Sequence, residues 1–152
     1  LYSNRAILKK HLLSIALVVL MASTVTSLAA MAIVQMVGLP QDVVVSIGPK
    51  SVTAPVAAEV ARINGGDPGL AIAFVVMTGV LGATFGPLLL TLLRVHSPLI
   101  RGLALGTVSH GQGTAIALLE GERQGTMAGI GMAVSAIITS TMFPAILPIV
   151  LS

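Results

Sequence analysis

The sequence predicts an all-α integral membrane protein with three full transmembrane helices and two broken or re-entrant helical segments. Mean hydropathy is +1.03 over 152 residues, and 9% of the residues are charged. A soluble domain carries about 25% charged residues, so composition alone indicates the membrane class. Two polar patches rich in glycine and proline interrupt the apolar sequence. Such breaks are tolerated at membrane depth where protein or a wet cavity surrounds them.

The three predicted spans are Leu12–Val37, Gly69–Leu93 and Gly125–Ser152, none of which contains a charged side chain. Each exceeds the ~20 helical residues that cross a bilayer core of about 30 Å. Residues 1–11 form a basic segment before the first span, and the positive-inside rule puts that segment in the cytoplasm. We therefore expect a single transmembrane domain over residues 12–152.

The two segments between the spans, Leu39–Ile63 and Pro98–Glu122, are broken by glycine and proline. Each is either one interrupted helix that crosses the membrane or a hairpin that enters and leaves on one side. With hairpins, every arginine after the first span except Arg62 lies on the same side of the membrane as the basic segment. Crossing helices move Arg94 and Arg101 to the far side. The positive-inside rule therefore favours hairpins, while crossing helices stay as the alternative.

A weak internal repeat relates the two broken segments. With hairpins, one span separates the two copies, so the copies enter from opposite faces and form an inverted repeat. Repeats of this kind place solute sites near the bilayer midplane. The residues Thr53, Ala54, Glu59 and Arg62 recur with the same spacing at Thr114, Ala115, Glu120 and Arg123.

Lys50 is the cation of the first polar patch, between Pro49 and Ser51. A charge within a membrane segment is costly and usually faces a cavity or a partner. Lys50 is therefore a candidate carboxylate-binding or gating group. The alternative is a structural lysine that extends its ammonium to the headgroups or pairs with Glu59 or Asp42.

His110 is the titratable group of the second patch, which runs from Ser109 to Thr114. Gly111 and Gly113 allow close approach of a ligand to the backbone. Ser109, Gln112 and Thr114 add neutral hydrogen-bonding groups. The imidazole is suited to bind an acid group or to carry a proton. In the alternative interpretation, the carbonyl group of a neighbouring helix satisfies His110, which then holds the turn in place.

Helical arms that begin at Thr53 and Thr114 would point their N-termini at the breaks, where free N–H groups favour an anion. Capping of the helix is the alternative role for each hydroxyl. We expect the site to bind a small carboxylate solute. The candidate substrate-binding residues are Lys50, Ser51, Thr53, Ser109, His110, Gly111, Gln112, Gly113 and Thr114.

Two further patterns predict structural contacts. Glu59–Arg62 and Glu120–Arg123 have the i,i+3 spacing of ion pairs on a helix face. Small residues let membrane helices pack closely, and we favour internal packing over a contact in a homo-oligomer for them. These residues are Gly79, Gly82 and Gly86 in the second span and Gly125 and Gly129 in the third.

The sequence gives no support for an enzyme. Ser109 and His110 are adjacent, which does not supply the geometry of a nucleophile and its base. The three histidines lack metal-ligand spacing, no phosphate-binding loop is present, and the chain has no cysteine. We therefore expect no catalytic residue, no metal and no cofactor. The net charge of +3 comes from few groups and does not indicate nucleic-acid binding.

The two patches resemble the LrgB/CidB family of bacterial membrane proteins. The first match runs from Pro49 to Ala57 and resembles PKSVT-x-P-x-A; it continues at Gly65-Gly66 and at Thr78-Gly79-x-x-Gly82-Ala83. The second runs from Arg101 to Ala115 and resembles RGLALGT-x-SH-x-x-GTA. Leu1-Tyr2 resembles the end of a PLY stretch, so the chain resembles a C-terminal portion of such a protein. Gln112 stands where relatives often have an apolar residue, which marks a candidate specificity position.

This resemblance implies a multi-pass protein of the bacterial plasma (inner) membrane, and it implies two functions. One is transport of small monocarboxylates of the pyruvate and glycolate class. The other is an antiholin-like role, in which the protein modulates murein hydrolase activity and autolysis with a small LrgA/CidA-type membrane partner. We expect the carrier function first and keep the modulator as the alternative.

Overall fold

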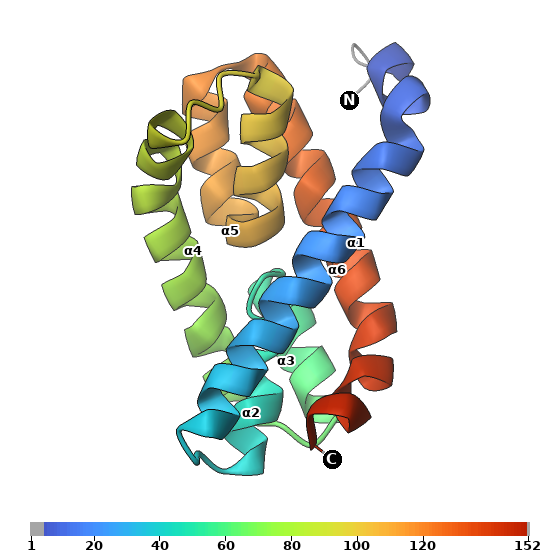
Figure 1. Cartoon of the computed structure of the whole chain (residues 1–152), viewed down its shortest axis with the longest axis vertical. Helices are drawn as coiled ribbons and strands as arrows, with labels where there is room; N and C mark the ends of the chain where they lie inside the picture. The colour runs from blue at the N-terminus through green and yellow to red at the C-terminus, as the bar shows by residue number, and fades with distance from the viewer. Residues whose placement is uncertain (1–4, 152) are drawn as a thin grey trace.

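The computed structural model describes the backbone of residues 5–151 and the side chains of residues 12–151. The side chains of the basic segment, residues 1–11, therefore lie outside the described residues. The described part of the chain is helical, with short connections (Figure 1). Its elements are α1 (Arg5–Met36), α2 (Gln41–Ile47), α3 (Ala54–Ile63), α4 (Pro68–Leu92), α5 (Pro98–Glu120) and α6 (Glu122–Leu151).

The predicted spans correspond to α1, α4 and α6, apart from Ser152, which lies outside the described residues. These helices are long and apolar enough to cross a membrane over Leu12–Met36, Pro68–Leu92 and Glu122–Leu151. Asp67 caps α4, because its carboxylate accepts a hydrogen bond of 2.7 Å from the Leu70 N–H. Prolines lie inside α4 and α6 without ending either helix. The prediction of three full transmembrane helices is confirmed.

The first broken segment is a hairpin made of α2, a turn over residues 48–53, and α3. Its two ends lie together, because the Asp67 N–H, just after α3, donates a 2.8 Å hydrogen bond to Ser46 Oγ of α2. Val44 and Val45 of α2 also share an apolar cluster with Val60 of α3. We call this unit the first hairpin and residues 48–53 the first tip.

The second broken segment is also a hairpin, formed within α5. His110 has φ 40° and ψ −124°, which are not helical values, and it separates two arms. The arms run back along each other, since a Cβ added at Gly113 would stand 2.9 Å from the Leu105 carbonyl carbon. Arg101 near the start of α5 pairs with Glu120 at its end. We call this unit the second hairpin and residues 109–114 the second tip.

The two hairpins enter the bundle from opposite ends and point their tips toward its middle (Figure 1). α4 runs between the base of the first hairpin and the base of the second. The structure therefore agrees with hairpins rather than crossing helices, and with the opposed orientation expected of an inverted repeat.

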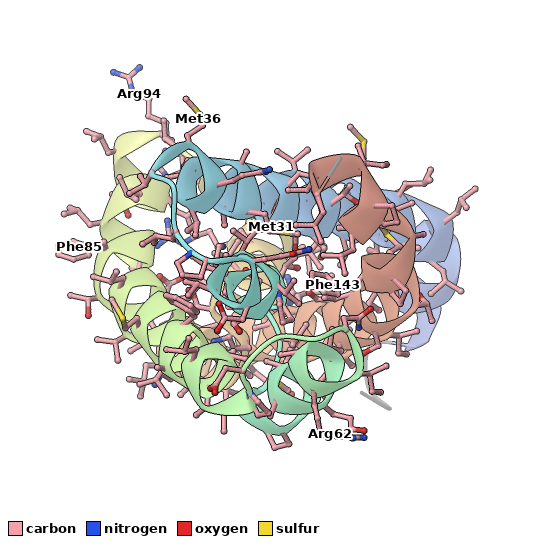
Figure 2. The ribbon with its side chains drawn as sticks, turned by 90° about the horizontal axis from the view of Figure 1, so that it is seen from below. Met31, Met36, Arg62, Phe85, Arg94 and Phe143 are labelled. Atoms are coloured by element: carbon pink, nitrogen blue, oxygen red, sulfur yellow. The ribbon has the colours of Figure 1, made fainter. Side chains whose placement is uncertain are left out.

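The interior packs around the hairpins with small and apolar residues. Met31 of α1 and Phe143 of α6 are fully buried beside the first hairpin, whereas Met36 and Phe85 point outward (Figure 2). A second cluster joins Val52 at the first tip to Ala71 and Val75 of α4. These two clusters thus surround the first hairpin and pack it against α1, α4 and α6.

Glycines bring the second hairpin close to its neighbours. Gly79, Gly82 and Gly86 of α4 face the side chains of Gln112, Ser109 and Leu105. Internal packing is therefore the observed role of these three glycines.

The predicted small-residue pair of α6 needs correction. A Cβ at Gly129 would meet nothing within 4 Å, so close packing against the hairpin does not require a glycine there. Gly125 faces Leu118, and Gly131 faces Thr107 and Leu103.

Candidate functional site

The first tip is an irregular turn at the inner end of the first hairpin. α2 ends before Pro49, whose ring leaves no backbone N–H to continue the helix. The Lys50 N–H donates to the Ile47 carbonyl over 3.1 Å, and the Val52 N–H donates to the Pro49 carbonyl over 3.3 Å. The remaining carbonyl groups of the turn need partners from other elements, because an unpaired polar group at membrane depth is costly.

Hydroxyl groups from two spans supply those partners. Ser27 Oγ of α1 donates to the Gly48 carbonyl over 2.6 Å. Ser135 Oγ of α6 donates to the Ser51 carbonyl over 3.3 Å. Both serines are at most 5% exposed. These hydrogen bonds fix the backbone of the first tip between α1 and α6.

Lys50 lies at the first tip and is half-buried. Its ammonium donates a 3.3 Å hydrogen bond to Ser51 Oγ. Among the described residues the ion pairs are Arg62–Glu59 and Arg101–Glu120, so Lys50 has neither of the carboxylate partners considered from the sequence. An ammonium group has three donors. Lys50 therefore keeps donor capacity for an anionic group.

His110 makes the turn of the second tip. Its side chain is 5% exposed, and its Nε2 lies 3.0 Å from the Val75 carbonyl oxygen of α4. This contact is the structural role considered from the sequence, a histidine satisfied by a neighbouring helix. Its backbone lies in a region that favours glycine. The hydrogen bond and the buried position hold His110 in this strained conformation.

The other residues of the second tip divide between contact with α4 and contact within the hairpin. Ser109 is buried against Gly82, and Gln112 lies against Gly79. Gln112 Oε1 is buried and has no hydrogen-bond partner among the described residues. Gly113 lets the second arm approach the first, while Gly111 is exposed, with nothing within 4 Å of its Cβ position.

The two threonines expected to start the outgoing arms behave differently. α3 does begin after Thr53, but the Thr53 hydroxyl makes no capping hydrogen bond. The second arm begins at the His110 turn rather than at Thr114, because the glycines on either side of Gln112 remain helical. Thr114 Oγ1 instead donates to the His110 carbonyl over 2.8 Å.

The tips meet through shared neighbours. Val75 packs its side chain in the cluster that contains Val52 of the first tip, and its carbonyl oxygen contacts His110 of the second. On α6, Ser135 Oγ donates to the Ser51 carbonyl of the first tip. The Met132 sulfur on the same helix lies 4.0 Å from Thr114 Oγ1 of the second tip. Among the described residues, no hydrogen bond or ion pair joins the candidate residues of one tip directly to those of the other.

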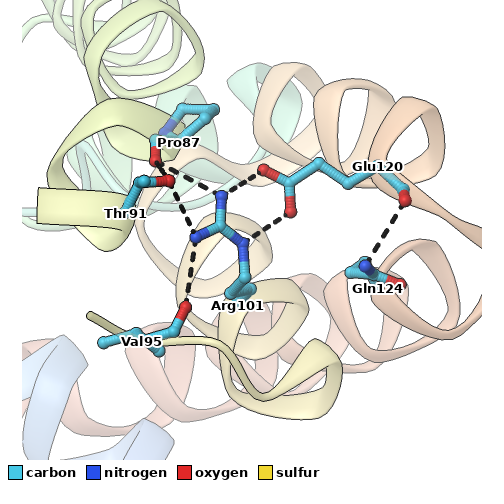
Figure 3. A network of polar contacts seen from close by, with 6 residues as sticks. All are labelled: Pro87, Thr91, Val95, Arg101, Glu120 and Gln124. Carbon is cyan, nitrogen blue, oxygen red and sulfur yellow. Dashed lines mark hydrogen bonds and ion pairs between the residues drawn. The ribbon is translucent and has the colours of Figure 1, made fainter. Parts of the chain in front are cut away.

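A polar network closes the base of the second hairpin, opposite its tip (Figure 3). The Arg101 guanidinium contacts both oxygens of Glu120, over 2.8 Å and 2.6 Å. It also donates to Thr91 Oγ1 and to the Val95 and Pro87 carbonyls. Hydrogen bonding from Arg101 lowers the pKa of the Glu120 carboxyl below its ordinary value.

This network corrects one sequence prediction. Glu120 pairs with Arg101 across the hairpin rather than with Arg123, because α5 ends at Glu120 and Gly121 has φ 154°. The other predicted pair, Glu59–Arg62, is confirmed at 2.6 Å, with side chains 55% and 63% exposed. Exposed ion pairs contribute little to stability, so we expect the less exposed Arg101–Glu120 pair to stabilise the fold more than Glu59–Arg62.

Sequence reasoning missed the residues that support the tips. Ser23 and Ser27 of α1, and Ser135 and Thr139 of α6, are buried hydroxyl residues one helical turn apart. Hydroxyl residues at i,i+4 spacing within an apolar span indicate a helix face that makes polar contacts, so the sequence could have pointed to them. Val75 carried no such signal, since its backbone carbonyl is the contacting group. Among the described residues, no group of three or more His, Cys, Asp or Glu side chains is placed to hold a metal ion.

The comparisons with known proteins identify the family. Residues 1–149 match the model of the LrgB-like family. No solved structure matches the chain.

Three relatives extend this match over nearly the whole chain. YxaC of Bacillus subtilis (strain 168) is 36% identical over 95% of this chain and 63% of its own length. YwbG of the same organism is 33% identical over 97% of this chain and 65% of its own length. The holin-like protein CidB of Staphylococcus aureus (strain N315) is 33% identical over 97% of this chain and 64% of its own length. The chain spans a little less than two-thirds of these relatives. It is a membrane protein that belongs to the LrgB-like family.

Proposed function

We propose that the full-length protein is a holin-like or antiholin-like modulator of murein hydrolase activity and autolysis. The observation that carries this proposal is 33% identity to holin-like CidB proteins over 97% of the chain. The protein acts in the bacterial inner membrane, with the N-terminal end of this chain in the cytoplasm, and it has no catalytic activity of its own. It works with a small LrgA/CidA-type membrane partner.

Gly129 supports contact with such a partner. It lies on a spanning helix, and its Cβ position is open, so internal packing does not account for its small size. Small residues on membrane helices allow close approach of another helix. A large side chain at Gly129 would block that approach while leaving the hairpins intact.

The test uses cells that lack the full-length protein and its partner. Restoring both should change the autolysis rate and the murein hydrolase activity of cell extracts. Gly129→Leu should abolish recovery of the partner in a pull-down and remove the effect on autolysis, whereas Ser140→Ala should retain both. An unchanged autolysis rate on restoring the wild-type pair would contradict the modulator proposal.

A second candidate function, transport of a small monocarboxylate of the pyruvate and glycolate class, has its own support. Two opposed hairpins place their tips at mid-molecule, and Lys50 there has no carboxylate partner among the described residues. Charge-assisted hydrogen bonds from an ammonium suit a carboxylate. In this proposal Lys50 and Ser51 bind the carboxylate, and His110 orients the second tip.

The carrier test is uptake of labelled pyruvate into proteoliposomes that contain the full-length protein. Lys50→Met should reduce uptake at least tenfold, because it removes the charge while keeping the side-chain length. Ser140→Ala should leave uptake unchanged. Absence of uptake of any short acid by the wild type would reject the carrier, and full uptake by Lys50→Met would reject the role of Lys50. The modulator proposal predicts normal autolysis control in Lys50→Met.

A further inference from the structure

A groove lies between α4 and the first arm of the second hairpin. Its volume is about 530 Å³, within the range of about 300–1,000 Å³ that ligand pockets occupy. Gly82, Gly86 and Ala104 contribute little bulk to its lining. Leu81 and Phe85 contribute large apolar side chains that are 53% and 52% exposed. The groove therefore offers an apolar surface that the described residues leave uncovered.

The groove extends over about half of the membrane-spanning length. Its lining on α4 runs from Thr78 to Leu90, which is about 18 Å at 1.5 Å per residue. One leaflet contributes about 15 Å, half of the roughly 30 Å hydrocarbon core. The groove reaches Ser109 of the second tip, at mid-molecule, and extends toward the base of the second hairpin. An acyl chain occupies a single leaflet, whereas a spanning helix would need a groove along the whole of α4.

A cation stands just beyond the outer end of the groove. α4 ends at Leu92, and the Val95 N–H closes the turn that follows by donating to the Leu90 carbonyl over 2.9 Å. Arg94 lies within this turn, is exposed, and points away from the bundle (Figure 2). The two ion pairs among the described residues do not include Arg94. Its guanidinium is therefore available to an anionic group at the membrane face.

The backbone of Arg94 adopts a conformation that favours glycine. Its φ is 57°, and its N–H donates to the Thr91 carbonyl over 3.0 Å. Helix ends of this kind usually carry glycine, because a Cβ is strained in the left-handed region. Packing does not account for an arginine here, since the side chain is exposed. A charge used at the membrane face would account for it.

We infer that this groove binds an anionic phospholipid, with an acyl chain between α4 and α5 and the headgroup phosphate on Arg94. The apolar lining suits a hydrocarbon chain, and a guanidinium binds phosphate through paired N–H donors. The positive-inside rule assigns this end of the bundle to the cytoplasm, where the leaflet surface is negatively charged. Basic sites between membrane helices on that side bind lipid headgroups. This inference goes beyond the two proposed functions and depends on neither.

The first test is thermal unfolding of the purified full-length protein in neutral detergent, with added dioleoyl phosphatidylglycerol or dioleoyl phosphatidylcholine. These lipids have the same acyl chains and differ in net headgroup charge. Phosphatidylglycerol should raise the Tm by about 2–4 °C more than phosphatidylcholine, because a lipid that binds the folded state stabilises it. Arg94→Gln should lose this difference. Arg123→Gln, which removes an exposed cation at the start of α6, is the matched control and should keep it. Glycerol phosphate, which has no acyl chain, should give no rise.

The second test places a single tryptophan in the groove, since the chain contains none. In bilayers, brominated acyl chains quench the fluorescence of a tryptophan that they contact. With native tryptophans of the full-length protein replaced, quenching at Phe85→Trp should show about fivefold preference for brominated phosphatidylglycerol over brominated phosphatidylcholine, the factor expected from one basic residue near the surface. Adding Arg94→Gln should remove the preference. Met77→Trp, an exposed position on α4 outside the groove, is the control and should be quenched equally by both lipids.

An equal effect of the two lipids on the wild-type Tm would overturn the inference. A full preference for phosphatidylglycerol in Arg94→Gln would place the headgroup elsewhere and overturn it as well. Absence of quenching at Phe85→Trp by either lipid would show that another helix of the full-length protein fills the groove, and a rise with glycerol phosphate would show that the groove is not needed; either result would reject the lipid site. Neither test involves lysis or uptake, so its outcome is separate from that of the proposed functions.

Discussion

At the residue scale, His110 combines a strained backbone with a buried hydrogen bond. Its φ of 40° favours glycine, and its Nε2 lies 3.0 Å from the Val75 carbonyl oxygen. A conformation of this kind costs about 1–3 kcal/mol for a residue with a Cβ. The imidazole contact offsets part of that cost and ties the second tip to α4.

Two substitutions separate these contributions. His110→Ala loses the hydrogen bond and keeps the strain, whereas His110→Gly loses the hydrogen bond and relieves the strain. We expect His110→Gly to be more stable than His110→Ala by about 1–3 kcal/mol, measured by thermal unfolding in detergent. Equal stability of the two variants would show that the backbone at this position carries no strain.

The sequence indicated Lys50 and His110 as the important residues but could not supply their partners. The patch residues stand out because polar side chains and glycines are rare in apolar spans. The contact of His110 with Val75 could not be predicted, since a backbone carbonyl is available on every residue. The pairing of Glu120 was predicted wrongly, because i,i+3 spacing assumes a continuous helix and α5 ends at Glu120.

At the element scale, the second hairpin depends on close contact between α5 and α6. A Cβ at Gly106 would clash with the Ala128 carbonyl oxygen and stand 2.5 Å from the Ala128 Cα, and this backbone cannot move aside as a side chain can. The hydrophobic pattern predicted α6 as a span but not which of its faces meets the hairpin.

Alanine should have different effects at Gly106, whose Cβ position is blocked, and at Gly129, whose Cβ position is open. We expect Gly106→Ala to destabilise the protein by about 1–3 kcal/mol, because overpacking forces the helices apart. Gly129→Ala should be neutral or stabilising by up to about 1 kcal/mol, since its Cβ position is open and alanine favours a helix. Thermal unfolding in detergent measures both, and a larger loss in Gly129→Ala would contradict this packing.

The Arg101–Glu120 pair should make the base of the second hairpin sensitive to acid. Hydrogen bonding lowers the pKa of Glu120 in the folded state, so its contribution is complete above the ordinary carboxyl pKa. The contribution is lost as the pH falls through the lowered pKa. Glu120→Gln should cost about 1–3 kcal/mol at pH 7, and the difference from the wild type should shrink toward acid pH.

The matched control for this pair is Glu59→Gln. Its ion pair with Arg62 lies on one exposed helix face, so the substitution should change stability little at any pH. Unfolding temperatures over a pH series measure both variants. A Glu120→Gln difference that stays constant down to acid pH would rule out the ionised pair as its cause.

At the scale of the whole molecule, the hairpins assign each connection to one of two faces. The turn after α3 and the turn after α1 lie at one end of the bundle, and the connections at each end of α5 lie at the other (Figure 1). The distribution of positive residues predicted this arrangement. With hairpins, Arg62 is the one arginine after the first span that does not lie on the side of the basic segment. Length could not decide it, since a broken crossing helix and a hairpin need similar numbers of residues.

Cysteine labelling tests the arrangement directly, because the chain contains no cysteine. In the full-length protein with native cysteines replaced, Gly65→Cys should react with a membrane-impermeant reagent added outside intact cells. His96→Cys, an exposed position at the other end, should react only after the membrane is opened. Reaction of His96→Cys but not of Gly65→Cys in intact cells would contradict the hairpin arrangement, because a crossing first segment puts residue 65 in the cytoplasm and residue 96 outside.

The Arg101 network has a consequence for biogenesis. Three of its oxygen acceptors, on Pro87, Thr91 and Val95, precede Arg101 in the chain, and Glu120 follows it. We expect the guanidinium to pair with these earlier acceptors during synthesis, before the second arm of α5 exists. Held there, it would keep the first arm from translocating, so the nascent segment turns back and meets Glu120 on the side from which it entered.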